Sequence, residues 1–150
     1  MTTAELLKPL SRQKLWLAAI KPPMYTVAVV PIVLGTAIAV AESGKFQGGV
    51  FATFLLSAIA IVAWINISND VFDSDTGIDK NKAESVVNLT GNRNLMFWLS
   101  NMLLVGGLVG VASICWTQQD WTVVEIVIFC CFLGYTYQGQ IGRASCRERV

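Results

Sequence analysis

Long stretches without a charged side chain are the feature that most constrains this protein. Three such stretches contain no Asp, Glu, Lys or Arg, and a fourth, 121–142, is interrupted only by Glu125. Each is long enough for a helix that crosses a bilayer, which needs about 20 apolar residues. Only 14% of the residues are charged, against about 25% in soluble domains, which is too few to cover four such helices in water.

The sequence therefore predicts an all-α fold, a multi-span transmembrane helical bundle. We expect spans at about 22–41, 47–69, 95–116 and 121–139. A short helix that includes Trp16 is expected to lie at the membrane interface before the first span. In the third span, Gly106 and Gly110 have the small-xxx-small spacing that lets two membrane helices approach closely.

Basic residues collect on one side of the predicted spans. They lie before the first span and between the second and third, at Lys8, Arg12, Lys14, Lys21, Lys80, Lys82 and Arg93. The short loop after the first span has only Lys45, and the turn at 117–120 has no basic residue. Because loops rich in Lys and Arg stay in the cytoplasm, the N-terminus and the 70–93 loop are predicted to be cytoplasmic. The membrane itself, plasma or thylakoid, is left open.

The segment 141–150 is a different kind of sequence. Its ten residues resemble the translation of a common sequencing adapter, codon by codon. Segments of that kind are excluded from reasoning about a fold. We therefore expect 1–140 to be the N-terminal part of a membrane domain that runs on beyond Gly139. The alternative is a genuine polar tail.

The most informative polar segment begins where the second predicted span ends. It holds four carboxylates within ten residues, at Asp70, Asp73, Asp75 and Asp79. If the second helix continues that far, a turn of about 100° per residue places one set of side chains on a narrow line. We call this set the carboxylate stripe; it consists of Asn66, Asn69, Asp70 and Asp73. Asp75 would point to the opposite side, and Gly77 would let the chain leave the helix so that Asp79 can return from a loop.

Crowded carboxylates repel one another and therefore favour a bound cation. Oxygen donors select hard ions, and Mg²⁺ commonly binds one or two carboxylates together with substrate phosphates. Lys80, Lys82 and Arg93 would supply positive charge for the same phosphate oxygens. A diphosphate at the membrane surface, with a long apolar tail in the bilayer, fits both the carboxylate stripe and the apolar spans.

Other interpretations of these residues stay open. For Asp75 the simpler interpretation is a solvent-exposed acid of the loop. Lys82 fits a diphosphate-binding role and a role as a basic residue that sets topology equally well. The carboxylate stripe itself favours a functional role, because acids at a membrane boundary are costly to maintain. An EF-hand calcium loop fails because Ile78 stands where that motif requires glycine. The net charge of +1 gives no indication of nucleic-acid binding.

The same segment resembles a known family. Asn69-Asp70-x-x-Asp73 is similar to the first aspartate-rich motif of the UbiA superfamily of intramembrane prenyltransferases. Most members place the next aspartate closer than here, where Asp79 follows Asp73 by six residues. That longer spacing resembles the 1,4-dihydroxy-2-naphthoate branch, and the run 79–92 looks like its cyanobacterial and plastid form. The resemblance extends over residues 10–139.

The resemblance implies a Mg²⁺-dependent prenyltransferase of about nine helices, of which four are present here. The residues it implies for the metal are Asp70, Asp73 and Asp79. Those it implies for the diphosphate are Asn66, Asn69, Lys80, Lys82 and Arg93. Loss of the diphosphate would give an allylic cation shielded from water, which an electron-rich ring attacks.

The implied reaction joins a long prenyl chain, with phytyl expected, to 1,4-dihydroxy-2-naphthoate or 2-carboxy-1,4-naphthoquinone. Carbon dioxide is lost, and the product leads to phylloquinone or menaquinone. A second aspartate-rich loop belongs to the family pattern and is absent from this sequence, so we expect the chain alone to be inactive. The alternatives are a homogentisate or chlorophyll tail transferase of the same superfamily, and a non-catalytic four-helix membrane protein. The oligomeric state is not predicted.

Overall fold

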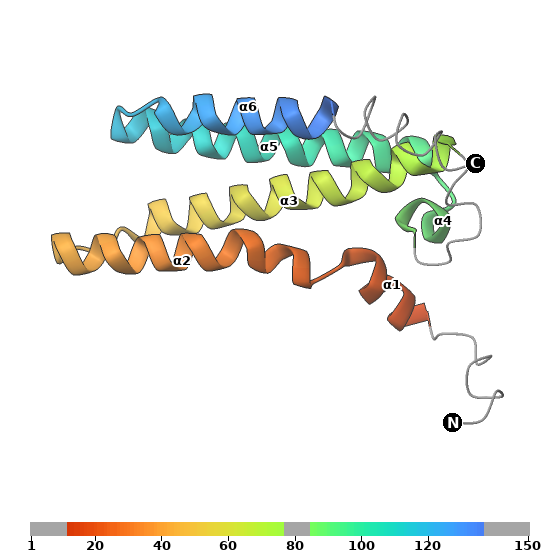
Figure 1. Cartoon of the computed structure of the whole chain (residues 1–150), viewed down its shortest axis with the longest axis horizontal. Helices are drawn as coiled ribbons and strands as arrows, with labels where there is room; N and C mark the ends of the chain where they lie inside the picture. Colours follow the sequence, from red (N-terminus) through yellow and green to blue (C-terminus); the bar gives the residue numbers. More distant parts are fainter. Residues whose placement is uncertain (1–11, 77–84, 137–150) are drawn as a thin grey trace, which may run out of the picture.

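The computed structural model describes residues 12–76 and 85–136, and every regular element in those two ranges is an α-helix. In chain order the helices are α1 (Arg12–Ile20), α2 (Pro23–Ser43), α3 (Gly48–Thr76), α4 (Val86–Thr90), α5 (Arg93–Gln118) and α6 (Thr122–Thr136). Figure 1 shows α2, α3, α5 and α6 running alongside one another, with α1 and α4 in contact near the end of α3. The predicted all-α class is confirmed for this part of the chain.

Three of these helices are long and apolar enough to cross a membrane: α2, α3 over Gly48–Ser74, and α5. Each begins within two residues of the predicted span, although α3 continues seven residues beyond its predicted end at 69. The protein is thus an integral membrane protein. Helix α6 is apolar but has only 15 residues in the described range, so the fourth span stays a prediction.

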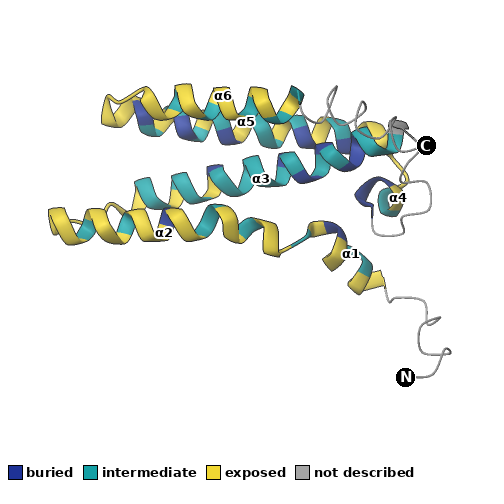
Figure 2. Ribbon diagram, in the orientation of Figure 1, coloured by how far each residue is buried: buried dark blue, intermediate teal, exposed yellow. Residues whose placement is uncertain are grey.

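The apolar side chains of the bundle point mostly outward. Figure 2 shows exposed residues along α2 and α6, and α6 has no buried residue among those described. Val27, Phe129 and Phe132 are each more than 60% exposed. Soluble monomers rarely present such continuous apolar area, whereas lipid chains solvate it readily. This distribution agrees with the membrane assignment.

The most extensive helix contact joins α3 to α5 and depends on two glycines. A Cβ at Gly107 would lie 2.7 Å from Ile61 Cγ1 and 2.9 Å from the carbonyl oxygen of Ser57, and a Cβ at Gly110 would overlap the Ser57 hydroxyl. Gly106 has nothing within 4 Å of such a position. The predicted close approach is therefore confirmed at Gly110, and the second glycine that faces α3 is Gly107, one residue after Gly106.

A small hydrophobic core lies beside the end of α3. It joins α1, α3, α4 and α5, and its members are Ala19, Val71, Val86, Val87 and Met96, with Trp16, Ile67, Leu89 and Phe97 packed against them. Helix α1 is the short helix expected before the first span, whereas α4 was not expected. The core fixes both short helices next to the carboxylate stripe.

We predict that Gly107→Ala destabilises the bundle and that Gly106→Ala does not. The methyl group at 107 would press against a backbone carbonyl that cannot rotate aside, and overpacking of this kind costs about 1–3 kcal/mol. Gly106→Ala is the matched control because the same change, one residue earlier in α5, meets open space. Thermal unfolding of the chain in detergent micelles, followed by tryptophan fluorescence, measures both. Equal melting temperatures would contradict the close contact of α3 with α5.

Candidate functional site

The carboxylate stripe is helical throughout, because α3 continues as far as Thr76. Its residues recur every three or four positions and therefore share one face of the helix. The face is not uniform. Asn66 is 2% exposed and Asp70 is 0% exposed, whereas Asn69 and Asp73 are half-buried. The stripe thus divides into a buried pair and a more accessible pair.

Asp70 is held by groups from two distant segments. Lys21 Nζ lies 3.3 Å from Oδ1, and the backbone N–H of Val86 donates to Oδ2 over 3.0 Å. Lys21 is in the turn between α1 and α2, 49 residues before Asp70, and Val86 is the first residue of α4. Burial of a charge is tolerable only when the charge is paired and hydrogen-bonded. Both oxygens of this carboxylate meet that condition.

Asn66 fixes the turn that carries Lys21. Its Nδ2 donates to the carbonyl oxygens of Ala19, at 3.3 Å, and Ile20, at 3.0 Å. Those carbonyls belong to the last turn of α1, which has no further helical N–H groups to bond them. Lys21 follows with φ of 50°, a left-handed conformation that costs a non-glycine residue about 1–2 kcal/mol. The Asn66 amide therefore stabilises the strained turn that brings Lys21 to Asp70.

The accessible pair is joined by its own hydrogen bond. Asn69 Nδ2 donates to Asp73 Oδ2 over 3.2 Å, one turn along α3. This bond helps to orient the Asp73 carboxylate. Arg93, which was predicted to contact the diphosphate, is exposed at the start of α5, after the helix cap formed by Asn92. It lies at the same end of the bundle as the stripe.

Other predicted site residues lie outside the described ranges: Asp79, Lys80, Lys82 and the side chain of Asp75. Their roles stay predictions. Within 12–76 and 85–136, no three His, Cys, Asp or Glu side chains come together as a metal-binding group. Mg²⁺ needs only one or two carboxylates beside phosphate oxygens and water, so the oxygen donors of the stripe fit this ion. Lys21 and Val86 engage both oxygens of Asp70, whereas Asp73 belongs to the more accessible half of the stripe.

Two buried oxygens at this end of the bundle lack a partner among the described protein groups. They are Asn66 Oδ1 and the hydroxyl oxygen of Ser85, which is 0% exposed just before α4. A buried polar atom left without a hydrogen bond costs about 1–3 kcal/mol. Water or a ligand atom at these positions would remove that cost, which favours a polar occupant next to the stripe.

Lys21 is the important residue that the sequence alone did not identify as part of the site. The sequence indicated it as one of the basic residues that set the orientation. Its position directly before Pro22 and the first span is a weak local signal of a special turn. Its partner, however, is 49 residues away, and no periodicity connects the two.

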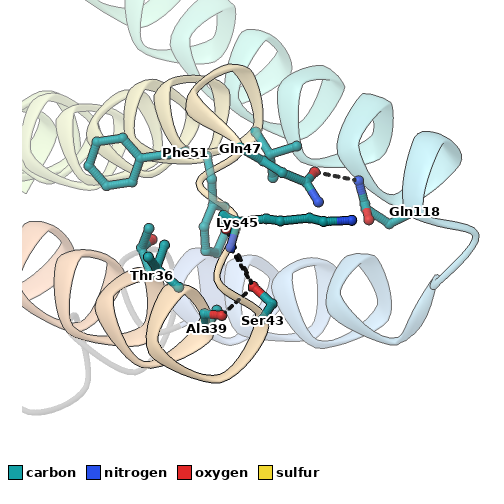
Figure 3. A pocket seen from close by; sticks show the side chains of 10 residues that line it. Thr36, Ala39, Ser43, Lys45, Gln47, Phe51 and Gln118 are labelled. Carbon is teal, nitrogen blue, oxygen red and sulfur yellow. Dashed lines mark hydrogen bonds between the residues drawn. The ribbon is translucent and has the colours of Figure 1, made fainter.

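A separate hollow of about 240 Å³ lies at the other end of the bundle, around the turn between α2 and α3. Figure 3 shows Lys45 and Gln47 beside Gln118 of α5, with Gln118 Nε2 donating to Gln47 Oε1 over 3.4 Å. Ser43 caps the end of α2 through the carbonyl of Ala39. No carboxylate lines this hollow, so its chemistry differs from that of the stripe.

Comparison with known proteins gives consistent matches. The sequence profile described as the UbiA prenyltransferase family matches residues 28–146. The chain is 67% identical over 127 residues to 2-carboxy-1,4-naphthoquinone phytyltransferase of Synechocystis sp.. It is 42% identical over 132 residues to the chloroplastic 2-carboxy-1,4-naphthoquinone phytyltransferase of Arabidopsis thaliana.

The two alignments differ in how much of each protein they cover. Both cover 85% of this chain, but they cover 41% of the Synechocystis protein and 33% of the Arabidopsis protein. The chain therefore spans less than half the length of these relatives. No solved structure matches the chain.

We predict that Asn66→Ala loosens α1 from the bundle. Two carbonyl groups at the end of α1 would lose their side-chain donor, at a cost of about 1–3 kcal/mol. Hydrogen exchange of the α1 amides, measured by mass spectrometry on the chain in micelles, should become faster. Asn94→Ala, at an exposed position near the start of α5, is the matched control. Identical α1 exchange in the two variants would mean that the Asn66 amide does not hold the turn.

Proposed function

The chain belongs to the UbiA prenyltransferase family, and on that basis we propose that the complete protein transfers a phytyl group from its diphosphate to a naphthoate acid. The acceptor is 1,4-dihydroxy-2-naphthoate or 2-carboxy-1,4-naphthoquinone, and the product leads to phylloquinone. The observation that carries the proposal is the close similarity to the Synechocystis phytyltransferase, which extends through the carboxylate stripe.

In the proposed site, Mg²⁺ and the diphosphate bind beside the accessible half of the stripe. Asp73, oriented by Asn69, provides a carboxylate, and Asp79 is its predicted partner from the following segment. Mg²⁺ would neutralise the diphosphate and make it a better leaving group. Lys80, Lys82 and Arg93 are proposed to bind the remaining phosphate oxygens, because cationic donors form strong hydrogen bonds with them.

The apolar helices contribute by excluding water. An allylic cation formed when the carbon–oxygen bond breaks would otherwise be captured by water before the ring could attack it. Helices α2, α3 and α5 present apolar side chains along the length needed for a prenyl tail. The ring carbon that bears the carboxylate would form the new carbon–carbon bond, and carbon dioxide would leave.

The proposed orientation places α1 and the start of α5 in the cytoplasm. Both lie at the end of the bundle that carries Arg12, Lys14, Lys21 and Arg93, whereas Lys45 lies in the turn at the other end. An excess of basic residues on one side is the usual mark of the cytoplasmic face. The proposal holds for a plasma membrane and for a thylakoid.

We predict that a cysteine at position 45 is labelled from outside intact bacterial cells and that one at position 13 is not. Lys45→Cys places the thiol in the α2–α3 turn, and Gln13→Cys places it in α1. A membrane-impermeant maleimide reports which of them faces the exterior. The reverse pattern would contradict the orientation and place the diphosphate site on the outer face.

We predict that Asp73→Asn abolishes Mg²⁺-dependent binding of phytyl diphosphate and lowers transfer by about 100-fold or more, since the charge that holds the metal is lost. The assay uses a chimera in which residues 12–136 replace the matched segment of the Synechocystis enzyme. Asp120→Asn is the matched control, because Asp120 is an exposed acid in the α5–α6 turn at the other end of the bundle.

The same assay separates the alternatives. Transfer to homogentisate in place of the naphthoate would indicate a different acceptor with the same metal site. Diphosphate binding that persists unchanged in Asp73→Asn would overturn the metal-site proposal. A chimera that folds but neither binds phytyl diphosphate nor transfers the chain would favour the non-catalytic membrane protein.

A further inference from the structure

Lys21 connects the break between α1 and α2 to the carboxylate stripe, and the proposed reaction does not use it. Its ammonium group lies 3.3 Å from Asp70 Oδ1; the lysine side chain is 30% exposed and the aspartate side chain is 0% exposed. Exposed ion pairs contribute little to a structure, because water replaces either partner. Water does not reach the Asp70 carboxylate, so removal of Lys21 would leave a buried charge without its counter-ion.

Through Asp70, Lys21 fixes the position of the end of α3. The other carboxylate oxygen of Asp70 accepts the N–H of Val86, so a single side chain joins the α1–α2 turn, α3 and α4. One turn earlier, Asn66 ties α3 to the last carbonyls of α1. Contacts on two successive turns prevent α3 from rotating about its axis relative to α1.

The rotation of α3 decides where Asp73 points. Asp73 follows Asp70 by three residues on the same rigid helix, so any rotation that moves Asp70 moves Asp73 with it. A rotation of one residue, about 100°, would turn the Asp73 carboxylate away from its present direction. The hydrogen bond from Asn69 cannot prevent this, because Asn69 lies on α3 as well.

We propose that Lys21 is a positioning residue for the diphosphate end of the site: through its ion pair with Asp70 it sets the rotation of the end of α3 and thereby aims Asp73 at the bound diphosphate. The inference rests on the proposed function, since the aim of Asp73 matters only if a diphosphate binds there. Lys21 acts through Asp70 and does not contact the substrate. Lys21 and Val86 engage both oxygens of Asp70, so in this proposal Asp70 fixes the end of α3 and does not contact the diphosphate.

The test uses the chimera defined above and a double-mutant cycle. The variants are Lys21→Met, Lys21→Arg, Asp70→Asn and the combination of Lys21→Met with Asp70→Asn. Lys14→Met is the matched control, because Lys14 is an exposed lysine on α1. The quantities measured, per mole of protein in the folded size-exclusion peak, are the dissociation constant for phytyl diphosphate at fixed Mg²⁺ without the acceptor, and then kcat, KM and the Mg²⁺ concentration at half-maximal rate.

We expect Lys21→Met to lower kcat/KM by about 10- to 100-fold, the effect of a small misplacement of a reacting group. It should also raise the Mg²⁺ concentration needed for half-maximal rate. Lys21→Arg, which keeps the charge, should recover most of the rate, and Lys14→Met should match the parent. In the Asp70→Asn background, Lys21→Met should have little further effect, because neutral side chains no longer form the pair and the two changes are coupled.

Three results would overturn the inference. One is a Lys21→Met variant whose rate per folded protein equals that of Lys14→Met. Another is a loss on Lys21→Met that is equally large in the Asp70→Asn background, which would mean that Lys21 binds the substrate directly. The third is failure of Lys21→Arg to recover activity while the arginine variant folds normally. An inactive parent chimera would refute the proposed function itself, so the two failures are distinguishable.

Discussion

The burial of the Asp70 carboxylate is the constraint on which the site end of this protein depends. An uncompensated ion in such surroundings costs several kcal/mol even after the protein relaxes. Lys21, which compensates the charge, has a left-handed backbone conformation between α1 and α2. The Asn66 amide stabilises this strained turn by donating to the last carbonyls of α1. The position of α4 follows from the same carboxylate, because Val86 donates to its second oxygen.

The rest of the bundle is held together differently. Between α3 and α5 the backbone of α5 lies close to α3 at two glycines: Gly107 faces the Ile61 side chain and the Ser57 carbonyl, and Gly110 faces the Ser57 side chain. Lipid is as apolar as the side chains it touches, so membrane helices gain little from burying them and rely on such close contacts. At the site end, where water is near, α1 and α4 are instead held by a small hydrophobic core. The first part of α3 is therefore packed as in a membrane protein, and its last turns are packed as in a water-soluble protein.

Much of this could be predicted from the sequence, and the failures have physical causes. The spans follow from charge-free length, and the carboxylate stripe follows from helical periodicity. The end of α3 was placed too early because its acidic residues limit the span but do not end the helix. Gly106 and Gly110 were named for their four-residue spacing, and spacing does not reveal that Gly107 faces α3. Helix α4 has five residues, too few for a periodic signal.

The site was predicted less completely than the fold. Helical spacing predicted that the stripe residues share one face, and their chemistry stays a prediction. Their division into Asn66 and Asp70 on one side and Asn69 and Asp73 on the other depends on tertiary contacts. The pairing of Lys21 with Asp70 has no local sequence signal at all, since the two residues are separated by 49 positions.

That separation has a consequence for how the chain is assembled on the ribosome. Synthesis proceeds from the N-terminus at about 5–20 residues per second, so Lys21 leaves the ribosome about 2–10 seconds before Asp70. Val86 emerges 16 residues after Asp70, within a few seconds more. The lysine is therefore outside the ribosome before the acid with which it pairs in the folded protein. The order of synthesis thus makes the cation available before helix packing can bury the Asp70 carboxylate.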